Sequence, residues 1–571
     1  MIEFPPGLIL IVGAFVLAAT RGALFRVGAL VLPALTLAAV WMTTDEVVQV
    51  GWLGQALIPV QKNAPTMVFA TIFSVMTLVG ALFALNMDRR VELPAAFVYA
   101  GSAINVTFAG DLLTMFIFWE LMAVGSTVVI WSAGTAEAET AGRRYVNVHL
   151  VGGAVMMAGL ALHFTNTGSL ALTNLSNLDE PASALILVGI LINAAAPPLG
   201  SWLPDAYPAA SASGTVFLSA FTTKTAVYVL MVLFAGTEAL IWVGCGMAIY
   251  GIVYAILEND MRRILAYSIV NQVGFMVCGI GIGTQMALNG AAAHAFAHII
   301  YKALLLMSAG SVLYMTGKRK CTELGGLYRT MPLTMICGTI GALAISSFPA
   351  TSGFTTKSMI TDAAAHEHLQ TTWLILEAAS AGVFLHAGIK FPWFVFFQRD
   401  SGLRAPDPPL NMKIAMVLFA AACLGIGLYP APLYAILPFP DAGPNGPGGL
   451  LYHAYTPEHL INQFQLLLFA GFAFFALLKL LKRTETITLD ADWTYRTMFP
   501  RIWIVVLGPF FRWLAPAHRF VISALPTLIR KFFTDDPFGV PPHLVRKRLE
   551  VGPTVALLTL FLAVVLVFNL L

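Results

Sequence analysis

Charge is scarce in this sequence. Only 11% of its 571 residues are Asp, Glu, Lys or Arg, whereas a soluble globular protein carries about 25%. With 58% hydrophobic residues and a mean hydropathy of +0.80, the composition excludes a soluble enzyme. The 32 basic residues nearly balance the 29 acidic ones, so the net charge of +3 offers no basic face to a nucleic acid, and we expect no such partner.

Cysteine is also scarce, and its spacing excludes the usual cysteine-based sites. The five cysteines lie far apart, and no CxxC motif is present. We therefore predict buried, inert thiols and no cofactor or resident metal. They are Cys245, Cys278, Cys321, Cys337 and Cys423.

Long apolar runs are abundant instead. About 20 apolar residues are needed for a helix to cross the hydrocarbon of a bilayer. We count about sixteen such runs, which predicts an all-α polytopic membrane protein. The first run follows Met1-Ile2-Glu3-Phe4-Pro5-Pro6, which lacks the positive n-region of a signal peptide, so we expect it to remain as a membrane segment. The runs centre near residues 13, 33, 75, 101, 122, 156, 193, 224, 248, 274, 300, 340, 384, 422, 470 and 561.

The basic residues between these spans predict an orientation. Cytoplasmic loops hold the excess of Lys and Arg in membrane proteins. Through the fourteenth span, the alternate loops on one side contain only Lys62. The N-terminus is therefore predicted to lie outside a bacterial-type inner membrane. The loops on the other side contain Arg21, Arg26, Arg89, Arg90, Arg143, Arg144, Arg262, Arg263, Lys318, Arg319, Lys320, Arg329, Arg399, Arg404 and Lys413.

A Pro/Gly-rich stretch, Pro438 to Gly449, suggests a division of the chain. We predict N-terminal helices over 1–90, a core over 91–400, a last core helix within 401–437 and a C-terminal extension over 438–571. The extension is predicted to hold two transmembrane helices, with interfacial segments at Trp503 to Trp513 and Phe520 to Phe533 between them. Two roles are predicted for the extension: it binds a neighbouring subunit or anionic lipid, or it is only a positive-inside stop for the last helix.

Ionisable residues inside the spans are the main functional signal. Each buried Lys or acid costs about 2.5–3.5 kcal/mol in mid-membrane, so these side chains are expected to face the protein interior or water. An alternative for Lys390, which lies near the cytoplasmic end of its span, is snorkelling to the interface. The candidates are Glu120, Lys224, His294, His298, Lys302, Lys357, His386 and Lys390.

His294, His298 and Lys302 recur at intervals of four, so they share one face of a helix with about 6 Å of rise between neighbours. That separation is too long for a direct proton hop, and a relay through them requires intervening water. Histidine titrates closest to neutral pH and can pass a proton between its two nitrogens. The alternative is that the histidines only form hydrogen bonds between helices.

Two spans contain helix breakers. Pro197, Pro198, Pro204 and Pro208 interrupt the seventh, and Phe348 to Gly353 interrupts the twelfth just before Lys357. Unwound backbone at membrane depth is tolerated where it is packed in protein or lines a cavity, and paired broken helices point to a transport site. Two packing kinks are the alternative reading.

Several motifs resemble one family, the antiporter-like membrane subunits shared by respiratory complex I and the Mrp-type multisubunit cation/proton antiporters. The resemblance covers roughly residues 65 to 400, and the chain is most similar to the D-type subunits of Mrp antiporters. The motifs are Phe118-Trp119-Glu120-Leu121, Trp202-Leu203-Pro204-Asp205-Ala206, Lys224-Thr225-Ala226-Val227-Tyr228, Asp260-Met261-Arg262-Arg263-Ile264-Leu265-Ala266-Tyr267-Ser268, His294-xxx-His298-xxx-Lys302-Ala303-Leu304-Leu305 and Ser352-Gly353-Phe354-Thr355-Thr356-Lys357.

The resemblance implies a core of about fourteen helices with two inverted five-helix repeats, broken helices 7 and 12, and a central hydrophilic axis. The C-terminal extension adds about two helices. In this scheme Glu120 pairs with a lysine on the seventh helix, Lys224 carries the proton inward, and the eleventh-helix stripe passes it to Lys357. One position departs from the family pattern: nine residues before Trp202, where that lysine is expected, the chain has Asn193. Asn193 cannot carry a charge, so either Lys224 is the partner of Glu120 or the first half-channel does not conduct.

The resemblance implies a proton-translocating subunit of a multisubunit Na+ or K+/proton antiporter, a secondary transporter that moves protons along the central axis. Its expected partners are other subunits of the complex, the lipid bilayer, protons and Na+ or K+. One alternative is a proton-pumping membrane subunit of a quinone-linked oxidoreductase, complex I-like or hydrogenase-like, whose redox activity would belong to other chains. Another is a structural subunit that no longer conducts.

Overall fold

The computed structural model describes residues 2–52, 55–86, 90–440, 452–480, 490–491 and 493–502. The chain divides after residue 492 into two compact units, Met1–Asp492 and Trp493–Leu571. The described part of the second unit contains a π-helical turn, η6 (Thr494–Met498), and the short helix α20 (Phe499–Ile502). The predicted last span near residue 561 and both predicted interfacial segments lie outside the described residues.

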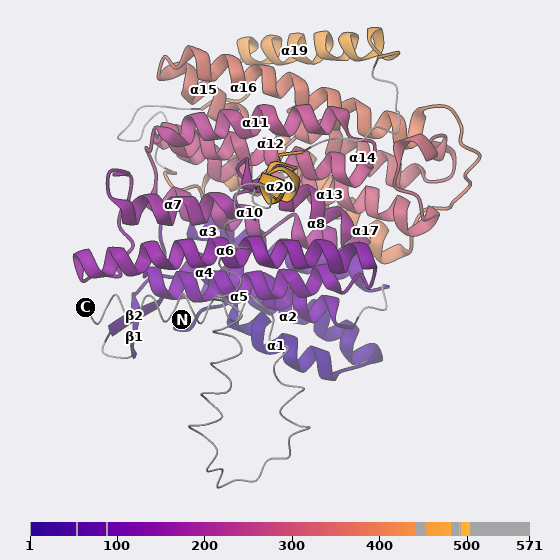
Figure 1. Ribbon diagram of the computed structural model, residues 1–571. Helices are drawn as coiled ribbons and strands as arrows, with labels where there is room; N and C mark the ends of the chain where they lie inside the picture. Colours follow the sequence, from indigo (N-terminus) through magenta and orange to yellow (C-terminus); the bar gives the residue numbers. More distant parts are fainter. Residues whose placement is uncertain are drawn as a thin grey trace. The chain divides into compact units, whose positions relative to one another are not determined.

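The first unit is built from helices, and each predicted span centre from residue 13 to residue 470 lies in one. Figure 1 shows them packed side by side. The first ten are α1 (Leu8–Ala19), α2 (Gly22–Met42), α3 (Thr66–Ala84), α4 (Glu92–Phe108), α5 (Leu112–Trp131), α6 (Ala136–Thr167), α7 (Pro181–Asn193), α8 (Trp202–Ala209), α9 (Ala212–Leu218) and α10 (Thr222–Leu233). A 3-10 turn, η1 (Leu199–Ser201), precedes α8.

The remaining helices of this unit continue the bundle. They are α11 (Ala239–Leu257), α12 (Met261–Ile282), α13 (Gln285–Thr316), α14 (Pro332–Ile345), α15 (Ser358–His366), α16 (Gln370–Val383), α17 (Leu410–Leu428), α18 (Ala431–Tyr434) and α19 (Pro457–Ala476). Two 3-10 turns, η2 (Cys321–Glu323) and η3 (Leu327–Arg329), follow α13, and two π-helical turns, η4 (Phe384–Lys390) and η5 (Trp393–Phe397), extend α16. The all-α prediction is confirmed.

Within the described residues, 11 helices are long and apolar enough to cross a membrane, and three shorter apolar ones accompany them. Helix α6 has 32 residues and is about 48 Å long, against about 30 Å of hydrocarbon. The helix is therefore longer than the hydrocarbon is thick, and Arg143 and Arg144 lie in its N-terminal part. The prediction that these two arginines lie in a loop is wrong. Arg262, predicted for a loop as well, is buried in the first turn of α12. Three further residues predicted for loops also lie in helices: Arg26 in α2, Arg263 in α12 and Lys413 in α17.

A two-stranded hairpin, which was not predicted from the sequence, lies between α2 and α3. Strand β1 (Val48–Trp52) pairs antiparallel with β2 (Gln55–Val60). Asp111 joins this hairpin to the bundle: its Oδ1 accepts from the backbone N–H groups of Leu113 and Thr114 at the start of α5, and its Oδ2 accepts from Ile58 N at 2.6 Å.

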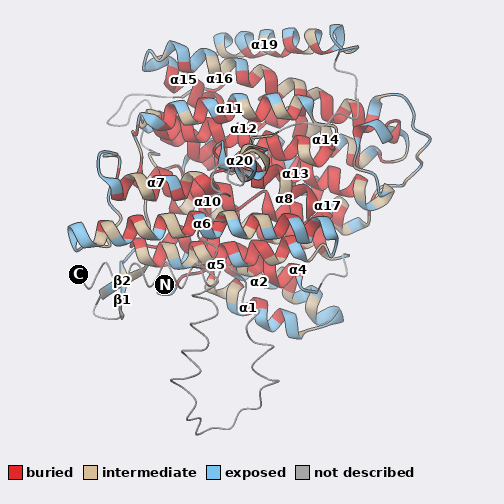
Figure 2. Cartoon of the chain, in the orientation of Figure 1, coloured by how far each residue is buried: buried red, intermediate tan, exposed pale blue. Residues whose placement is uncertain are grey.

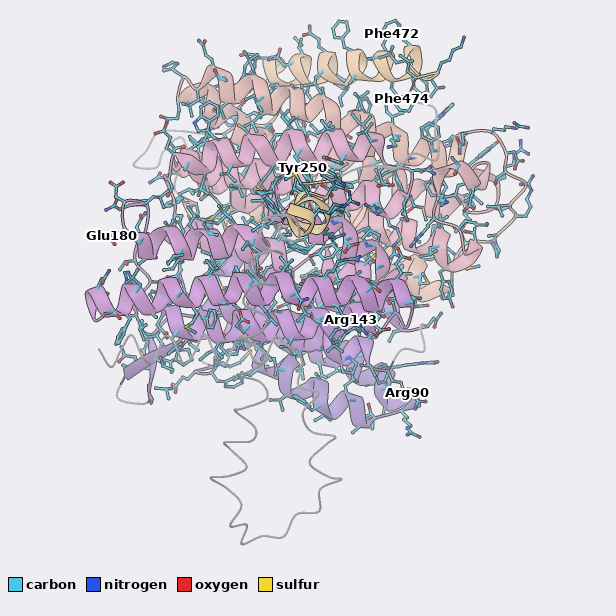
Figure 3. All side chains as sticks on the ribbon, in the orientation of Figure 1. Arg90, Arg143, Glu180, Tyr250, Phe472 and Phe474 are labelled. Carbon is cyan, nitrogen blue, oxygen red and sulfur yellow. The ribbon has the colours of Figure 1, made fainter. Side chains whose placement is uncertain are left out.

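The centre of the first unit is formed by α10, α12 and α13, whereas the outer helices have exposed faces (Figure 2). Many large side chains on these exposed faces are hydrophobic. Every residue of the apolar window of α12 is buried, compared with 22% of that of α19. On α19, Phe472 points outward and Phe474 points toward the bundle (Figure 3). Exposed apolar side chains on the outer helices are what a lipid-facing surface requires.

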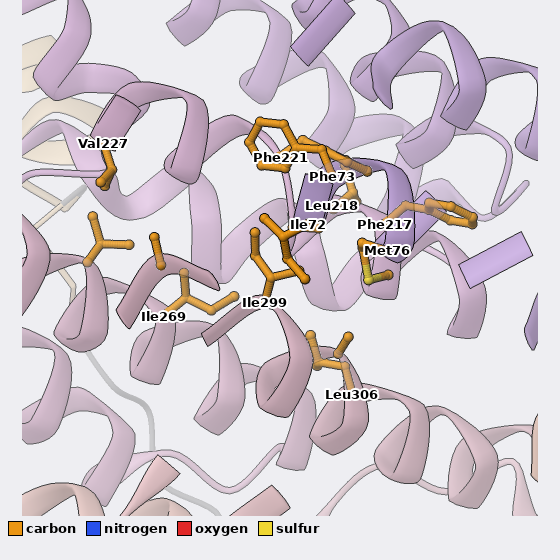
Figure 4. Close-up of a cluster of buried hydrophobic side chains, with 14 of the residues drawn as sticks. Ile72, Phe73, Met76, Phe217, Leu218, Phe221, Val227, Ile269, Ile299 and Leu306 are labelled. Carbon is orange, nitrogen blue, oxygen red and sulfur yellow. The ribbon is translucent and has the colours of Figure 1, made fainter. Parts of the chain in front are cut away.

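Aliphatic and aromatic side chains fill the contact between α3, α9, α10, α12 and α13. Figure 4 shows part of this cluster, in which Phe73 and Phe221 meet edge to face with ring centroids 5.4 Å apart. All five cysteines are buried and free, as the sequence predicts. The apolar packing holds rigidly the helices that carry Lys224 and Lys302.

Candidate proton-translocation site

Both broken spans begin with the same backbone motif. Helix α7 ends at Asn193, and Ala195 adopts a left-handed conformation with φ of 62°. Helix α14 ends at Ile345, and Ser347 follows with φ of 56°. In each break the next residue donates to the carbonyl five positions earlier, Ala196 N to Leu191 O and Phe348 N to Leu343 O, both at 3.0 Å. This is the Schellman arrangement, which satisfies the last carbonyls of a helix that stops inside a protein.

A glycine closes each break. A Cβ at Gly200 would clash with the carbonyl oxygen of Ala195, and a Cβ at Gly353 would clash with that of Ala344. Neither position tolerates a side chain without a backbone shift. The two breaks therefore share a construction, although their sequences differ.

The predicted Lys and His residues of the core are buried inside the bundle. Lys224, His294, His298 and Lys302 have no exposed surface, and Lys357 is 2% exposed. Lys224 Nζ donates to Ser219 O at 2.8 Å and to Thr223 Oγ1 at 3.1 Å. These positions agree with the expectation that charges in the spans face the interior.

Electrostatic interactions connect these residues into one series. Lys224 interacts with Lys302, His298 and His294, and Lys357 interacts with His294. The rings of His294 and His298 lie 6.1 Å apart, as the four-residue spacing predicts. We name the series Lys224, His294, His298, Lys302 and Lys357 the central seam.

Polar partners from α12 and α13 hold the seam. Gln272 Oε1 lies 3.1 Å from both His294 Nε2 and the hydroxyl of Tyr301. Lys302 Nζ donates to Ser268 Oγ at 3.0 Å. Both ring nitrogens of His298 and the Nδ1 of His294 are buried and form no hydrogen bond within the described residues. Since unpaired buried polar atoms are costly, these nitrogens suit a site that exchanges protons with water.

Gln272 and Ser268 were not predicted as site residues, because neither side chain is ionisable. A signal was present in the sequence. Asn271 and Gln272 follow Ser268 by three and four residues in the mostly apolar part of α12 beyond Arg263, so the three side chains lie on one face.

The first half of the core is different. Glu120 is half-buried on α5, packed against Gly153 of α6, and its Oε1 accepts no hydrogen bond within the described residues. No ion pair joins Glu120 to Lys224 in the described part of the chain. Asn193 is 2% exposed, and its Nδ2 has no partner there either. The structure thus brings Lys224 to the central seam rather than into an ion pair with Glu120.

Lys390 and His386 lie on the π-helical turn η4. Lys390 is 2% exposed, and its Nζ donates to the carbonyls of Ala255, Ile256 and Glu258 at 2.6 to 2.8 Å. It therefore caps the C-terminus of α11 and does not snorkel to the interface. The buried ring of His386 is bonded through Nδ1 to Gly382 O at 2.8 Å.

A buried ionic cluster at the end of the seventh span was also missed. Glu92 accepts hydrogen bonds from the hydroxyls of Ser132, Ser211 and Ser213. Arg262 donates to Pro208 O and Ala210 O at 2.8 Å, and to Ser211 O at 2.7 Å. Arg262 thereby fixes the chain where α8 ends, which explains why a basic residue beside a turn is buried.

Comparison with known proteins adds to this geometry. The family model described as NADH:quinone oxidoreductase/Mrp antiporter, transmembrane, matches residues 109–383. A probable A/B-type K(+)/H(+) antiporter subunit of Rhizobium meliloti is 30% identical over 397 residues, which are 64% of this chain and 40% of the relative. The D-type Na(+)/H(+) antiporter subunit of Alkalihalophilus pseudofirmus is 29% identical over 310 residues, which are 51% of this chain and 63% of the relative.

Both alignments cover less than two thirds of the relative's length. Among solved structures, a chain of the Mrp complex from a Dietzia species superposes with a TM-score of 0.65 at 22% sequence identity, covering 78% of this chain and 94% of that chain. This likeness confirms the fold that the motifs predict.

Proposed function

The core of this chain, residues 109–383, belongs to the NADH:quinone oxidoreductase/Mrp antiporter family of membrane proteins, and from that premise we propose that it is the proton-translocating subunit of a multisubunit Na+ or K+/proton antiporter. The observation that supports this proposal most is the central seam. Several titratable groups are buried there within electrostatic range of one another, although each buried charge in a membrane is costly.

In the proposed mechanism, the repulsion between protonated lysines of the central seam drives proton transfer. Lys224 and Lys302 interact repulsively when both are charged, so a proton arriving at one lysine favours proton loss from the other. His298 lies within electrostatic range of both lysines and can accept a proton on one ring nitrogen and release another from the second. Lys357 is the proposed terminal group. Glu120 with Lys224 is the proposed entry switch, in which Glu120 acts on Lys224 without a direct ion pair, since none joins them within the described residues.

Na+ or K+ is the proposed exchanged ion, because both relatives described above are named as antiporter subunits. The proposal places the chain in a bacterial-type inner membrane with its N-terminus outside, in contact with other subunits of the complex. His386, Lys390 and Asn193 flank the proposed pathway. The division into N-terminal helices, core and C-terminal extension remains part of this proposal.

A second candidate is a proton-pumping membrane subunit of a quinone-linked oxidoreductase, since the matching family model covers both kinds of complex. The subunits that co-purify in mild detergent distinguish the two functions. Small antiporter subunits would favour the antiporter, and quinone-reducing or hydrogenase subunits would favour the oxidoreductase. A structural, non-conducting subunit is the third reading, which the uncharged Asn193 supports.

The test is proton flux in inverted vesicles after a pulse of Na+ or K+, with Lys224→Ala and Lys357→Ala compared with the exposed Lys318→Ala. We expect both seam variants to lose the cation-driven flux and Lys318→Ala to keep it. Unchanged flux in both seam variants, at equal protein levels, would remove the lysines from the pathway and favour the third reading.

A further inference from the structure

A chamber of about 800 Å³ lies at the far end of the central seam. Its walls come from the twelfth-span break, α15, α16 and α19, and Lys357 lines it. Figure 1 shows α19 running beside α16. The chamber is therefore the place where the buried terminal lysine meets open space.

Helix α19 and the segment before it are fixed to this break by specific contacts. The hydroxyls of Tyr452 and Ser358 lie 2.5 Å apart, and Gln463 Nε2 donates to Ser346 O at 3.2 Å. The ring of His459 stacks on Phe354 with centroids 4.3 Å apart. This wall lies outside the matched residues 109–383, so the chamber is completed by a part of the chain that the family model does not cover.

The chamber is acidic. Asp362 on α15, Glu377 on α16 and Glu458 on α19 all line it. Asp362 interacts electrostatically with both glutamates, and Glu377 interacts with Lys357. With three carboxylates and one lysine in its lining, the chamber carries an excess of negative charge when the carboxylates are ionised.

One further polar group marks the chamber as a binding site. Ser347 is 1% exposed, lines the chamber, and its Oγ has no hydrogen-bond partner within the described residues. A buried hydroxyl without a partner is energetically costly. An ion or its hydration water in the chamber would satisfy this hydroxyl.

We propose that this chamber binds a hydrated monovalent cation, held by Asp362, Glu377 and Glu458, in competition with the proton on Lys357. The inference rests on the proposed antiport function and identifies where the exchanged cation meets the proton. When Lys357 loses its proton, the chamber gains one unit of net negative charge and attracts the cation. When Lys357 is protonated, its charge repels the cation.

The geometry favours a monovalent, hydrated ion over a chelated divalent one. Within the described residues no three His, Cys, Asp or Glu side chains lie close enough to hold a metal ion. Ca2+ needs about 6–8 oxygen ligands at short distance. A wide chamber with dispersed carboxylates suits an ion that keeps its water.

The pH dependence of binding follows from all the groups around Lys357. The carboxylates favour cation binding once ionised, and the protonated histidines oppose it. Since Lys357 loses its positive charge as the pH rises, cation affinity should increase from low to high pH. The groups are Asp362 and His366 of α15, His368 after it, Glu377 of α16, Glu458 and His459 of α19, His294 of α13 and His386 of η4.

The experiment is equilibrium binding of 22Na+ and 86Rb+ to the purified full-length protein with the subunits that co-purify. We expect saturable binding that is weakened at least tenfold in the double variant Asp362→Asn with Glu377→Gln. Lys357→Met should strengthen binding near neutral pH and flatten its pH dependence. Glu180→Gln is the matched control, because Glu180 is an exposed carboxylate at the start of α7, away from the chamber (Figure 3), and it should bind as the wild type does.

Two milder variants keep the test valid if the double variant does not fold. Glu377→Asp retains the charge and should bind within about threefold of the wild type, whereas Ser347→Ala should weaken binding modestly. No saturable binding in the wild type, or equal binding in the wild type and the folded carboxylate variants, would overturn the chamber site. Binding that follows the carboxylates without any cation-driven proton flux would instead leave the site standing and overturn the proposed antiport.

Discussion

The two broken spans have the same backbone conformation at the break but carry different side chains. Each has a left-handed residue two positions after its first helix, and each has a glycine closing on a carbonyl. The first break follows Asn193, whereas the second leads to Lys357 and the acidic chamber. The same backbone break can therefore occur with or without a proton-binding residue. An unwound helix provides a buried position for a charge, but proton transfer also requires a titratable side chain at that position.

The largest expected difference in proton flux is between a variant of a central-seam histidine and a variant of a buried histidine in the first half of the core. His298→Ala should lower cation-driven proton flux roughly 10²-fold, the usual contribution of a positioned proton-transfer group. His149→Ala should lower it less than twofold, because the His149 ring packs between Tyr145 and Trp202. Initial proton flux in inverted vesicles measures both, and equal losses would show that the first half conducts as well.

Because the two breaks have the same backbone conformation, replacing the glycine in either one should lower the stability of the protein by the same amount. Gly200→Ala and Gly353→Ala should each destabilise the protein by about 1–3 kcal/mol, because the new methyl group meets a carbonyl oxygen. Thermal unfolding in detergent, followed by intrinsic fluorescence, compares them, and Gly425→Ala serves as control because a Cβ there meets open space. If only one glycine variant is destabilised, the two breaks are not built alike.

A smaller loss of proton flux is expected at Gln272, which orients the ring of His294 but does not itself bind or release a proton. Gln272→Leu removes the 3.1 Å contact with His294 Nε2 and should reduce flux about three- to tenfold, the value of one hydrogen bond of about 0.5–1.5 kcal/mol. Gln272→Glu keeps an acceptor at this position and serves as the partner variant. Wild-type flux in Gln272→Leu would mean that the orientation of His294 does not limit transfer.

The smallest effect belongs to the first break. Asn193→Leu should leave both flux and thermal stability nearly unchanged, because the Asn193 amide nitrogen has no partner to lose within the described residues. Flux and unfolding are measured on the same preparation. A large loss of flux with normal folding would place Asn193 in the pathway and return the first half-channel to the mechanism.

The sequence predicted the spans and the seam because each has a strong local signal. Apolar runs of sufficient length mark the helices, and the four-residue spacing of His294, His298 and Lys302 marks one helix face. Gln272 was missed because it does not titrate, and the burial of Arg262 was missed because a basic residue beside a turn usually faces water.

The chamber could not be predicted from the sequence. Asp362, Glu377 and Glu458 are spread over about a hundred residues, and only the packing of α19 on the twelfth-span break brings the last of them to the other two. The contact of the β1–β2 hairpin with Asp111 is non-local in the same way, because it spans more than fifty residues.

The most direct test of the account is a cryo-electron microscopy map of the assembled complex at a resolution that shows ordered water. The account predicts water molecules bridging His298 to Lys302 and His294 to Lys357, in continuity with the acidic chamber. A map in which apolar side chains pack tightly between Lys302 and Lys357, with no water density, would contradict it.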